Sequence, residues 1–336
     1  MSMRVAVVGV GRFGRHHARI YGELPDVTLV AVVDLDQEAA STAAAPTGAK
    51  VLSDYRELEG QVDAVSVAVP TESHREVAGF FLERGVHCLV EKPLVGSSAE
   101  GRELIALAEK SGARLAVGHV ERFNPVVRAA RKHDITPRFI ESHRIHPFAF
   151  RSVDVGVVLD IMIHDLDLIL DLAGDVPEKV EATGVPVLTR HEDICNARLT
   201  FPDGCVANVT ASRVAMKTLR RLRIFSGDSY MSMDFGEKRG VLYKKSPKLT
   251  VEYVEQQKEN VKDLSDLAGM VFGDMLTVEP LSLDDQEPLT AELTDFVDAA
   301  RSGGQPMVPG VAGLRAVELA ERIIAEIARS PATRET

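Results

Sequence analysis

The chain has 336 residues, of which 45% are hydrophobic and 26% are charged, and its formal net charge at pH 7 is −11. This length is enough for two domains of ordinary size, and the composition is that of a globular protein with a sizeable apolar core. The acidic balance argues against a general nucleic-acid binder, because proteins that bind phosphate backbones carry a basic surface.

The sequence carries no sign of a disulfide framework, a cysteine-based zinc site or a targeting segment. Its three cysteines, Cys88, Cys195 and Cys205, are widely spaced and form no Cys-x-x-Cys pair. The N-terminal apolar run is short and leads into glycines, unlike a signal peptide. No apolar span approaches the roughly 18 residues that a membrane helix needs. We therefore expect a cytoplasmic protein that binds neither a membrane nor nucleic acid.

The first segment combines a glycine motif with the elements that a dinucleotide-binding fold needs. The β-branched run at 4–10 predicts a buried parallel strand, and the segment at 12–24 can form a helix. The run at 27–34 predicts a second strand, which ends in Asp34. A Gly-x-Gly-x-x-Gly sequence at 9–14 joins the first strand to the helix. This context is typical of a Rossmann fold and argues against a glycine turn that binds nothing.

The members of this motif have distinct physical tasks. Gly9 permits the tight turn, Gly11 lets the backbone approach a pyrophosphate, and Gly14 allows close packing of helix against strand. Arg12 and Phe13 lie at the N-terminus of the predicted helix, where free N–H groups and the positive dipole end favour an anion. We expect all five residues to contact the cofactor.

Asp34 indicates which cofactor is bound. Its carboxylate can accept hydrogen bonds from the adenosine ribose hydroxyls and would repel a 2′-phosphate. The next three residues, 35–37, provide no cation for such a phosphate. The sequence therefore favours NAD over NADP.

The alternation of strands and helices continues to residue 119. Strands are predicted at 64–70, 87–93 and 114–119, and a helix at 97–112. The strand ends carry Pro70, Thr71, Glu91, Lys92 and His119, and His74 opens the helix that follows Thr71. Because the carboxyl ends of parallel strands share one sheet edge, we expect these residues to gather there, all except His119 at the cofactor. A structural role stays open for two of them, since His74 can cap a helix and Lys92 can be a solvated lysine.

After residue 119 the pattern changes to consecutive strands. A helix is predicted at 121–133, a strand at 137–146 and a helix at 155–172. Strand-like runs follow at 179–188, 193–201, 205–214, 218–227, 229–235 and 248–254. Short turns between such runs indicate an antiparallel sheet. Residues 256–288 are acidic and read as irregular, and two helices, at 291–300 and 314–328, end the chain.

The predicted fold class is therefore α/β plus α+β. Residues 1–119 form a Rossmann domain with a doubly wound parallel sheet. Residues 120–336 form a substrate-binding and oligomerisation domain, with a large, mostly antiparallel sheet flanked by helices.

The predicted helix at 155–172 is mostly apolar, but Asp160 and His164 interrupt it four residues apart and share one face. An ionisable pair in such a helix is costly unless each member has a partner. Three interpretations are open: a structural pair, a reactive pair that faces a crevice, or a metal site completed by Asp165 and by His143 or His146.

Five segments of the chain together resemble the Gfo/Idh/MocA family of nicotinamide-dependent sugar oxidoreductases. They are GVGRFG at 9–14, Asp34, PTESH at 70–74, EKP at 91–93 and VGVVLDIMIH at 155–164. The last is similar to the family pattern GGxxxDxxxH, with Val155 where the first glycine is usual. Residues 118–125 and 157–168 further resemble family members that oxidise the 3-hydroxyl of UDP-N-acetylglucosamine, ahead of transamination in lipid A biosynthesis.

The resemblance implies a catalytic group made of Lys92, Asp160 and His164. His164 is the expected base, since a neutral imidazole accepts a proton near pH 7. Lys92 is expected to stabilise negative charge on the reacting oxygen, and Asp160 to hold a substrate hydroxyl or orient the ring. The roles of His164 and Lys92 can be exchanged, with Lys92 as the base. Hydride transfer of this kind needs no metal, so none is expected.

The resemblance also implies a sugar or nucleotide-sugar substrate and a homodimer or homotetramer. We expect His119, Arg122, Asn124, Arg151, Asp160 and His164 to line the substrate site, although Arg122 can equally pair with a surface acid. Arg144 and Arg151 suit bidentate contacts with a diphosphate, or are ordinary surface residues.

Three other functions stay open. The protein can be an inositol or other polyol dehydrogenase of the same fold. It can be a redox-neutral enzyme that keeps NAD bound while a transient ketone permits elimination or epimerisation. It can also be an NAD/NADH-sensing protein without catalysis, although the joint presence of Lys92, Asp160 and His164 argues against a pure sensor.

Overall fold

The computed structural model describes residues 2–149, 155–247, 249–257 and 275–329, and it forms two compact units. The first unit comprises Met1–Phe123, Val158–Leu170 and Gln286–Ala325, and the second comprises Asn124–Val157, Asp171–Asp285 and Glu326–Thr336. The units are defined by packing. The division of cofactor and substrate roles between 1–119 and 120–336 stays a prediction.

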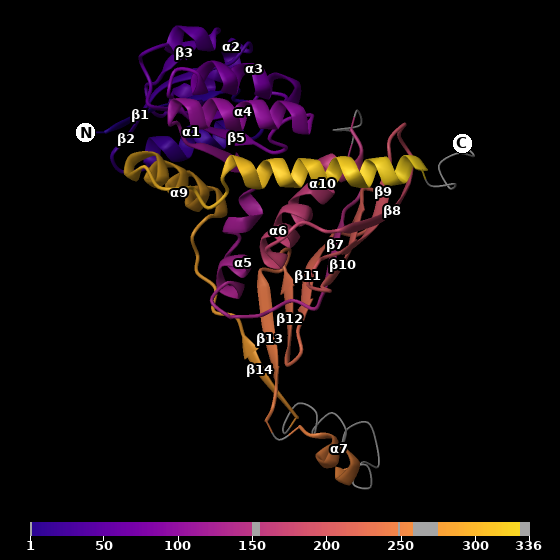
Figure 1. Cartoon of the computed structure of the whole chain (residues 1–336). Helices are drawn as coiled ribbons and strands as arrows, with labels where there is room; N and C mark the ends of the chain where they lie inside the picture. The colour runs from indigo at the N-terminus through magenta and orange to yellow at the C-terminus, as the bar shows by residue number, and fades with distance from the viewer. Residues whose placement is uncertain (1, 150–154, 248, 258–274, 330–336) are drawn as a thin grey trace. The chain divides into compact units, whose positions relative to one another are not determined.

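The first unit is built on a parallel sheet of six strands in the order β3-β2-β1-β4-β5-β6. Figure 1 draws this part of the chain in indigo to purple, with labels on β1, β2, β3 and β5. The strands are β1 (Met3–Val8), β2 (Val27–Val33), β3 (Lys50–Leu52), β4 (Ala64–Val67), β5 (His87–Glu91) and β6 (Leu115–Gly118). This order confirms the predicted doubly wound sheet. It reverses between β1 and β4, so the ends of these two strands lie at the switch point where such sheets bind ligands.

Helices cover both faces of this sheet. They are α1 (Gly14–Glu23), α2 (Gln37–Ala44), η1 (Tyr55–Leu58), α3 (Thr71–Leu82), α4 (Ser98–Ser111), η2 (Val120–Phe123) and α9 (Pro288–Ser302), and α10 (Gly310–Arg329) begins in the same unit. Alternate residues of β1 serve the two faces. Val5 and Val7 lie in one core with residues of α1 and α9, and Ala6 and Val8 lie in the other with residues of α3 and α4. Burial on both faces explains why the strand reads as a continuous apolar run.

The second unit is built on a sheet of eight strands in the order β14-β13-β12-β11-β7-β10-β9-β8. They are β7 (Phe139–Ile145), β8 (Lys179–Val185), β9 (Ile194–Thr200), β10 (Val206–Ser212), β11 (Leu219–Phe225), β12 (Ser229–Asp234), β13 (Arg239–Lys245) and β14 (Leu276–Pro280). Only the pairing of β7 with β10 is parallel, which confirms a mostly antiparallel sheet. Side chains of β7, β9 and β10 alternate between buried and more exposed, so one face of the sheet packs on a core.

The structure corrects two details of the sequence reading. The run at 248–254 is not a strand, because Val251–Gln257 forms helix α7, whose first turn is capped by the Thr250 hydroxyl, which accepts from the Tyr253 N–H at 3.1 Å. Residues 256–288 are not wholly irregular, because β14 lies among them and pairs with β13. Neither β13 nor β14 was predicted from the sequence. β14 was missed because it is short and mostly exposed.

The predicted helix at 155–172 begins as a π-helical turn, η3 (Val158–Met162), and continues as α6 (Ile163–Ala173). The predicted helix at 121–133 is divided into η2 and α5 (Pro125–Ala130). None of the helices among the described residues is long and apolar enough to cross a membrane.

Candidate active site

The glycine turn after β1 has the shape that a dinucleotide requires. Gly9 has φ +86°, and a Cβ there would lie 2.6 Å from the carbonyl oxygen of Ala68. A Cβ on Gly14 would lie 1.8 Å from the carbonyl oxygen of Gly9, so helix and turn touch at this point. Around Gly11, in contrast, no heavy atom lies within 4 Å of the position a Cβ would take. The turn is thus closed toward the protein and open at Gly11, which fits close approach of a pyrophosphate.

The start of α1 offers N–H groups to an anion. Its N-cap residue, Phe13, makes no side-chain capping hydrogen bond and is 51% exposed. The guanidinium of Arg12 lies over the Phe13 ring, 5.5 Å from its centroid. These features match the predicted cofactor contacts, whose roles stay a prediction.

Asp34 lies beside this turn and is partly committed to the backbone. Its Oδ2 accepts from the Val10 N–H at 2.7 Å, and its Oδ1 accepts from the Asp36 N–H at 2.9 Å. Each carboxylate oxygen can accept more than one hydrogen bond. The fixed carboxylate therefore keeps capacity for ribose hydroxyls, as the NAD prediction requires.

Glu91 ends β5 and is held by two neighbours. Its Oε1 lies 3.0 Å from His17 Nε2, and its Oε2 accepts from the Lys92 N–H at 3.3 Å. Burial alone would raise the pKa of Glu91, but the hydrogen bond from His17 and the charge of Lys92 outweigh it and hold the pKa below its usual range. Glu91 is therefore a charged anchor for the turn that carries Lys92.

Lys92 meets the π-helical turn through Asp160. Lys92 Nζ donates to the main-chain carbonyl of Asp160 at 2.8 Å and lies 3.6 Å from its Oδ1. The side chains of Lys92 and Asp160 are 14% and 25% exposed, so the pair is shielded yet reachable. The structure thus brings together two of the three predicted catalytic residues, which are 68 positions apart in the chain.

His164 lies one turn after Asp160 and faces a second histidine. Its ring centroid is 6.5 Å from that of His119, and the two rings are nearly perpendicular. His119 is 1% exposed, and burial lowers its pKa, so its ring is neutral. Among the residues described, neither ring nitrogen of His119 has a hydrogen-bond partner. The predicted substrate residue His119 therefore keeps free hydrogen-bonding capacity beside His164.

Arg122 pairs with an acid, as one of the two alternatives from the sequence allowed, but this acid is buried. Its Nε donates to Asp167 Oδ2 at 2.7 Å and its Nη2 to Oδ1 at 2.6 Å, and the two side chains are 6% and 1% exposed. The pair is bidentate and buried, so its acid partner is not a surface residue. It ties η2 to α6 three residues after His164, and this link was not predicted.

The remaining predicted site residues have other contacts. Asn124 caps α5, because its Oδ1 accepts from the Val126 N–H at 3.1 Å. Arg144 is 3% exposed and lies over the ring of Phe235, so it is no ordinary surface residue. Arg151 lies outside the described residues.

Residues of the PTESH motif at 70–74 interact with the backbone and do not line an open space. Pro70 is the N-cap of α3 and Thr71 is its first residue. His74 is 1% exposed, and its ring nitrogens lie close to three backbone carbonyl groups, those of Val69, Pro93 and Leu94. Burial lowers the pKa of His74, against the opposing effect of these carbonyls.

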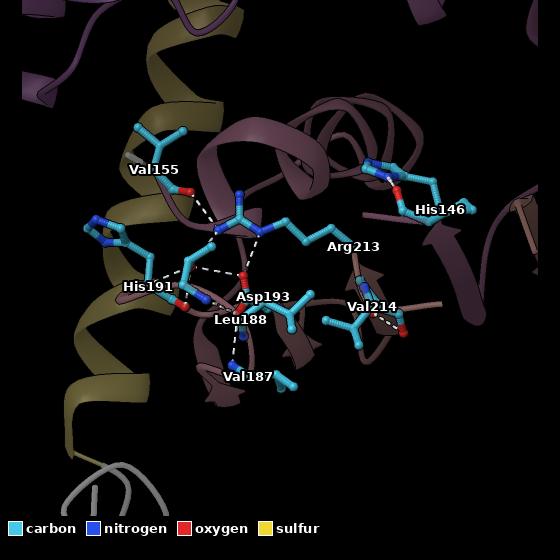
Figure 2. Close-up of polar contacts among 11 residues, drawn as sticks. His146, Val155, Val187, Leu188, His191, Asp193, Arg213 and Val214 are labelled. Carbon is cyan, nitrogen blue, oxygen red and sulfur yellow. Dashed lines mark hydrogen bonds and ion pairs between the residues drawn. The ribbon is translucent and has the colours of Figure 1, made fainter. Parts of the chain in front are cut away.

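A buried ion pair in the second unit anchors the segment that leads into η3 (Figure 2). Arg213 Nε donates to Asp193 Oδ1 at 2.7 Å, and Arg213 Nη2 donates to the carbonyl of Val155 at 2.9 Å. A Cβ on Gly156 would lie 1.9 Å from Glu192 Oε1, so the Glu192 carboxyl group packs directly against this glycine. Val155 contributes only its carbonyl to this network, so a glycine is not needed there.

Asp193 is held by several hydrogen-bond donors. Its Oδ2 accepts from three consecutive backbone N–H groups, those of Val187, Leu188 and Thr189. Burial opposes its charge, but these donors and Arg213 keep the pKa of Asp193 far below its ordinary range. The sequence reading missed this cluster, and an acid at the start of a predicted strand was its only local signal.

The metal interpretation gains no support from the described residues, in which no group of three or more His, Cys, Asp and Glu side chains could hold an ion. The arrangement instead offers a glycine cradle, a ribose acceptor and a lysine held against Asp160 near a histidine pair. Such a site can bind a dinucleotide and take a proton from an alcohol.

Comparison with known proteins gives consistent results along the chain. Residues 3–119 match the model of an oxidoreductase family with an NAD-binding Rossmann fold, and residues 118–228 match the Gfo/Idh/MocA C-terminal domain. The chain is 35% identical to UDP-N-acetylglucosamine 3-dehydrogenase of Acidithiobacillus ferrooxidans over 96% of both chains. A solved structure of that enzyme superposes with a TM-score of 0.87 at 34% identity and covers 98% of each chain.

More distant relatives act on other polyols. Inositol 2-dehydrogenase of Rhizobium meliloti is 29% identical over 56% of this chain and 61% of its own. Levoglucosan dehydrogenase in complex with NADH and L-sorbose has a TM-score of 0.82 at 16% identity. The match covers 98% of this chain and 97% of that chain, and at this identity the likeness concerns the fold alone.

Proposed function

Because the chain belongs to the Gfo/Idh/MocA family of NAD-binding oxidoreductases, we propose that it oxidises the 3-hydroxyl of UDP-N-acetylglucosamine to the 3-keto sugar. The reaction class rests above all on one observation, the hydrogen bond from Lys92 Nζ to Asp160 at 2.8 Å, one helical turn from His164. The choice of sugar rests on the relative from Acidithiobacillus ferrooxidans, which aligns over 96% of both chains.

The chain's own residues divide the work as follows. The turn at Gly9, Gly11 and Gly14 holds the pyrophosphate, and Asp34 holds the adenosine ribose. When bound, NAD accepts the hydride that leaves the carbon bearing the reacting hydroxyl. Loss of this hydride and of the hydroxyl proton converts the C–O single bond into the carbonyl.

His164 takes the hydroxyl proton in this proposal. Lys92 already acts as a donor to the Asp160 carbonyl and lies beside its carboxylate, so an ammonium with hydrogen-bond donors is held in place. Such a group suits stabilisation of the oxygen as negative charge develops. In the alternative, Lys92 takes the proton as a neutral amine, which still has two N–H groups and can keep its hydrogen bond to the Asp160 carbonyl. Asp160 orients Lys92, and His119 presents its open nitrogens to substrate hydroxyl groups.

We further propose that residues 1–119 bind the cofactor and residues 120–336 the sugar, and that the protein forms a homodimer or homotetramer. Alternate side chains of β9 are exposed, so its sheet has a face available for assembly. Light scattering coupled to size-exclusion chromatography tests the assembly, and a monomer at micromolar concentration would refute it.

The substrate is tested by following NADH absorbance with NAD and a panel of UDP-sugars, inositols and free sugars. A transaminase with glutamate is added to remove the keto product, because oxidation to a ketone is an unfavourable equilibrium. Turnover with UDP-N-acetylglucosamine supports the proposal. Turnover confined to an inositol supports the activity of the relative from Rhizobium meliloti instead, and tight NADH binding without turnover of any substrate supports a sensor.

A further inference from the structure

His74 joins the ends of two adjacent strands of the parallel sheet. It lies in the first turn of α3, and its ring is 1% exposed. One ring nitrogen, Nε2, lies 2.9 Å from the carbonyl oxygen of Val69, just after β4. The other, Nδ1, lies 3.0 Å and 3.2 Å from the carbonyl oxygens of Pro93 and Leu94, after β5. A single side chain thus spans two loops of the carboxyl edge.

These loops carry the residues on which the proposed reaction depends. Val69 leads into Pro70 and Thr71, which were predicted to contact the cofactor, and Pro93 directly follows Lys92. The Lys92 turn is also held from its other side, where Glu91 Oε2 accepts the Lys92 N–H. The position of Lys92 is therefore defined before the turn by Glu91 and after it by His74.

The chemistry of the contacts favours a dedicated bridge. Backbone carbonyl oxygens only accept hydrogen bonds, whereas imidazole donates from one nitrogen when neutral and from both when protonated. A buried carbonyl that loses its donor is left at a cost in free energy, and even a neutral ring donates to one of the two loops. Removal of the ring would therefore leave that loop without its donor and end the contact between the two loops. Lys92 Nζ reaches Asp160 at 2.8 Å from this turn, and a small shift of the turn would alter that contact.

We propose that His74 is a positioning residue for Lys92: it ties the β4 loop to the β5 loop and thereby sets where the Lys92 amine lies. The inference rests on the proposed catalytic role of Lys92. It assigns His74 an action through the backbone and no contact with substrate.

The test compares His74→Ala, His74→Asn and His74→Gln with a control on β5, the strand that leads to Lys92. Asn places an amide near the position of Nδ1 and Gln near that of Nε2, so each variant can restore one side of the bridge. The control is His87→Gln, because His87 begins β5 at the opposite edge of the sheet, where its Nδ1 accepts from the Arg114 N–H at 2.8 Å. For each variant, kcat, both Michaelis constants, NADH affinity and the thermal midpoint are measured.

Loss of the bridge is expected to lower kcat by on the order of 10²-fold in His74→Ala, the effect of misplacing a reacting group by about 1 Å. Asn and Gln should recover part of this loss, the Michaelis constant for NAD should change far less, and His87→Gln should keep the wild-type kcat. A wild-type kcat in folded His74→Ala would overturn the proposal. So would a lower thermal midpoint with unchanged kcat, since that pattern marks a purely structural residue. If His74→Ala does not fold, the Asn and Gln variants are judged by the same criteria.

A second readout does not require turnover and keeps this inference separate from the substrate proposal. Reaction of the Lys92 amine with an amine-specific reagent is followed by peptide mass spectrometry in each variant. We expect Lys92 to be labelled severalfold faster in the His74 variants and at the wild-type rate in His87→Gln. Unchanged labelling in all His74 variants would refute the positioning role, even if the wild-type protein oxidised no sugar in the panel.

Discussion

Two buried polar clusters differ in how fully their hydrogen-bonding groups are used. In the second unit, Asp193 accepts five hydrogen bonds, from three backbone N–H groups, the Thr189 hydroxyl and Arg213. In the first unit, both nitrogens of His119 and both carboxyl oxygens of Glu292 are buried without a partner among the described residues. A satisfied cluster stabilises a fold, whereas buried polar groups with open capacity need water, a proton or a ligand. The difference separates a structural cluster from a reactive one.

The largest effect is expected from Lys92 and His164, the two proposed catalytic residues near His119. Lys92→Ala and His164→Ala should each lower kcat by about 10²–10⁴-fold, the contribution of a general base or of a positioned donor to the reacting oxygen. NADH affinity, measured by fluorescence titration, should change little, because the glycine turn and Asp34 are untouched. Lys110→Ala, at the exposed end of α4, is the control. Full activity in either variant would exclude the altered residue from catalysis.

The structural cluster should respond in stability instead. Asp193→Asn or Arg213→Met should lower the free energy of unfolding by about 3–5 kcal/mol, because each leaves a buried charge without its partner. Urea denaturation measures the loss. The double variant should lose less than the sum of the two single variants, since the residues interact directly.

The exposed pair Arg75–Glu103 provides the matched control for this comparison. Both side chains are 54% exposed, so Arg75→Met should cost at most about 1 kcal/mol. Equal losses in Arg75→Met and Arg213→Met would mean that burial of the Arg213 pair adds nothing to stability.

Glu292 should make stability depend on pH. Burial first, and then the charges of Glu91, Asp295 and Asp167, raise the pKa of Glu292 well above its ordinary value. The folded protein therefore keeps a proton that the unfolded chain releases, so stability falls as pH rises from the unfolded pKa toward the folded one. Each unit of difference between these pKa values costs about 1.4 kcal/mol at higher pH.

Glu292→Gln mimics the protonated acid and should remove this dependence, which leaves the variant more stable than wild type at alkaline pH. Urea denaturation over a pH series measures the effect. Glu109→Gln, an exposed site on α4, serves as the control and should follow the wild-type curve. A Glu292→Gln curve parallel to wild type would show that Glu292 is ionised in the folded protein.

Asp34 is intermediate between the two clusters in how fully its hydrogen-bonding capacity is used. Backbone N–H groups use part of this capacity and leave part for a ligand. Asp34→Ser should weaken NAD binding about tenfold, or roughly 1.4 kcal/mol. It should also reduce the preference of the protein for NAD over NADP. Binding of both cofactors is measured by titration. Asp36→Ser, which replaces the N-cap residue of α2 by another residue suited to that position, should leave the NAD/NADP ratio as in wild type. An unchanged ratio in Asp34→Ser would refute the ribose contact.

Patterns within short segments predicted much of the fold. The β-branched runs before Gly9 and Asp34 marked β1 and β2, and the Ser97 start and Gly112 stop marked α4. The run at 248–254 was misread because a Thr cap and favourable helix residues outweighed its β-like composition. The catalytic residues themselves came from resemblance, since nothing local distinguishes Lys92 from a solvated lysine.

By itself, the sequence determined the alternation of strands and helices, the glycine turn with its acid and the change to a mostly antiparallel second sheet. These features follow from periodicity and backbone chemistry over a few residues. Only the tertiary structure decided that Arg122 meets Asp167, that Asp193 meets Arg213 and that His74 meets the Lys92 turn. Hydrophobic periodicity marks which face of an element is buried, but it does not specify which polar groups, 19 to 45 residues apart, meet in the interior.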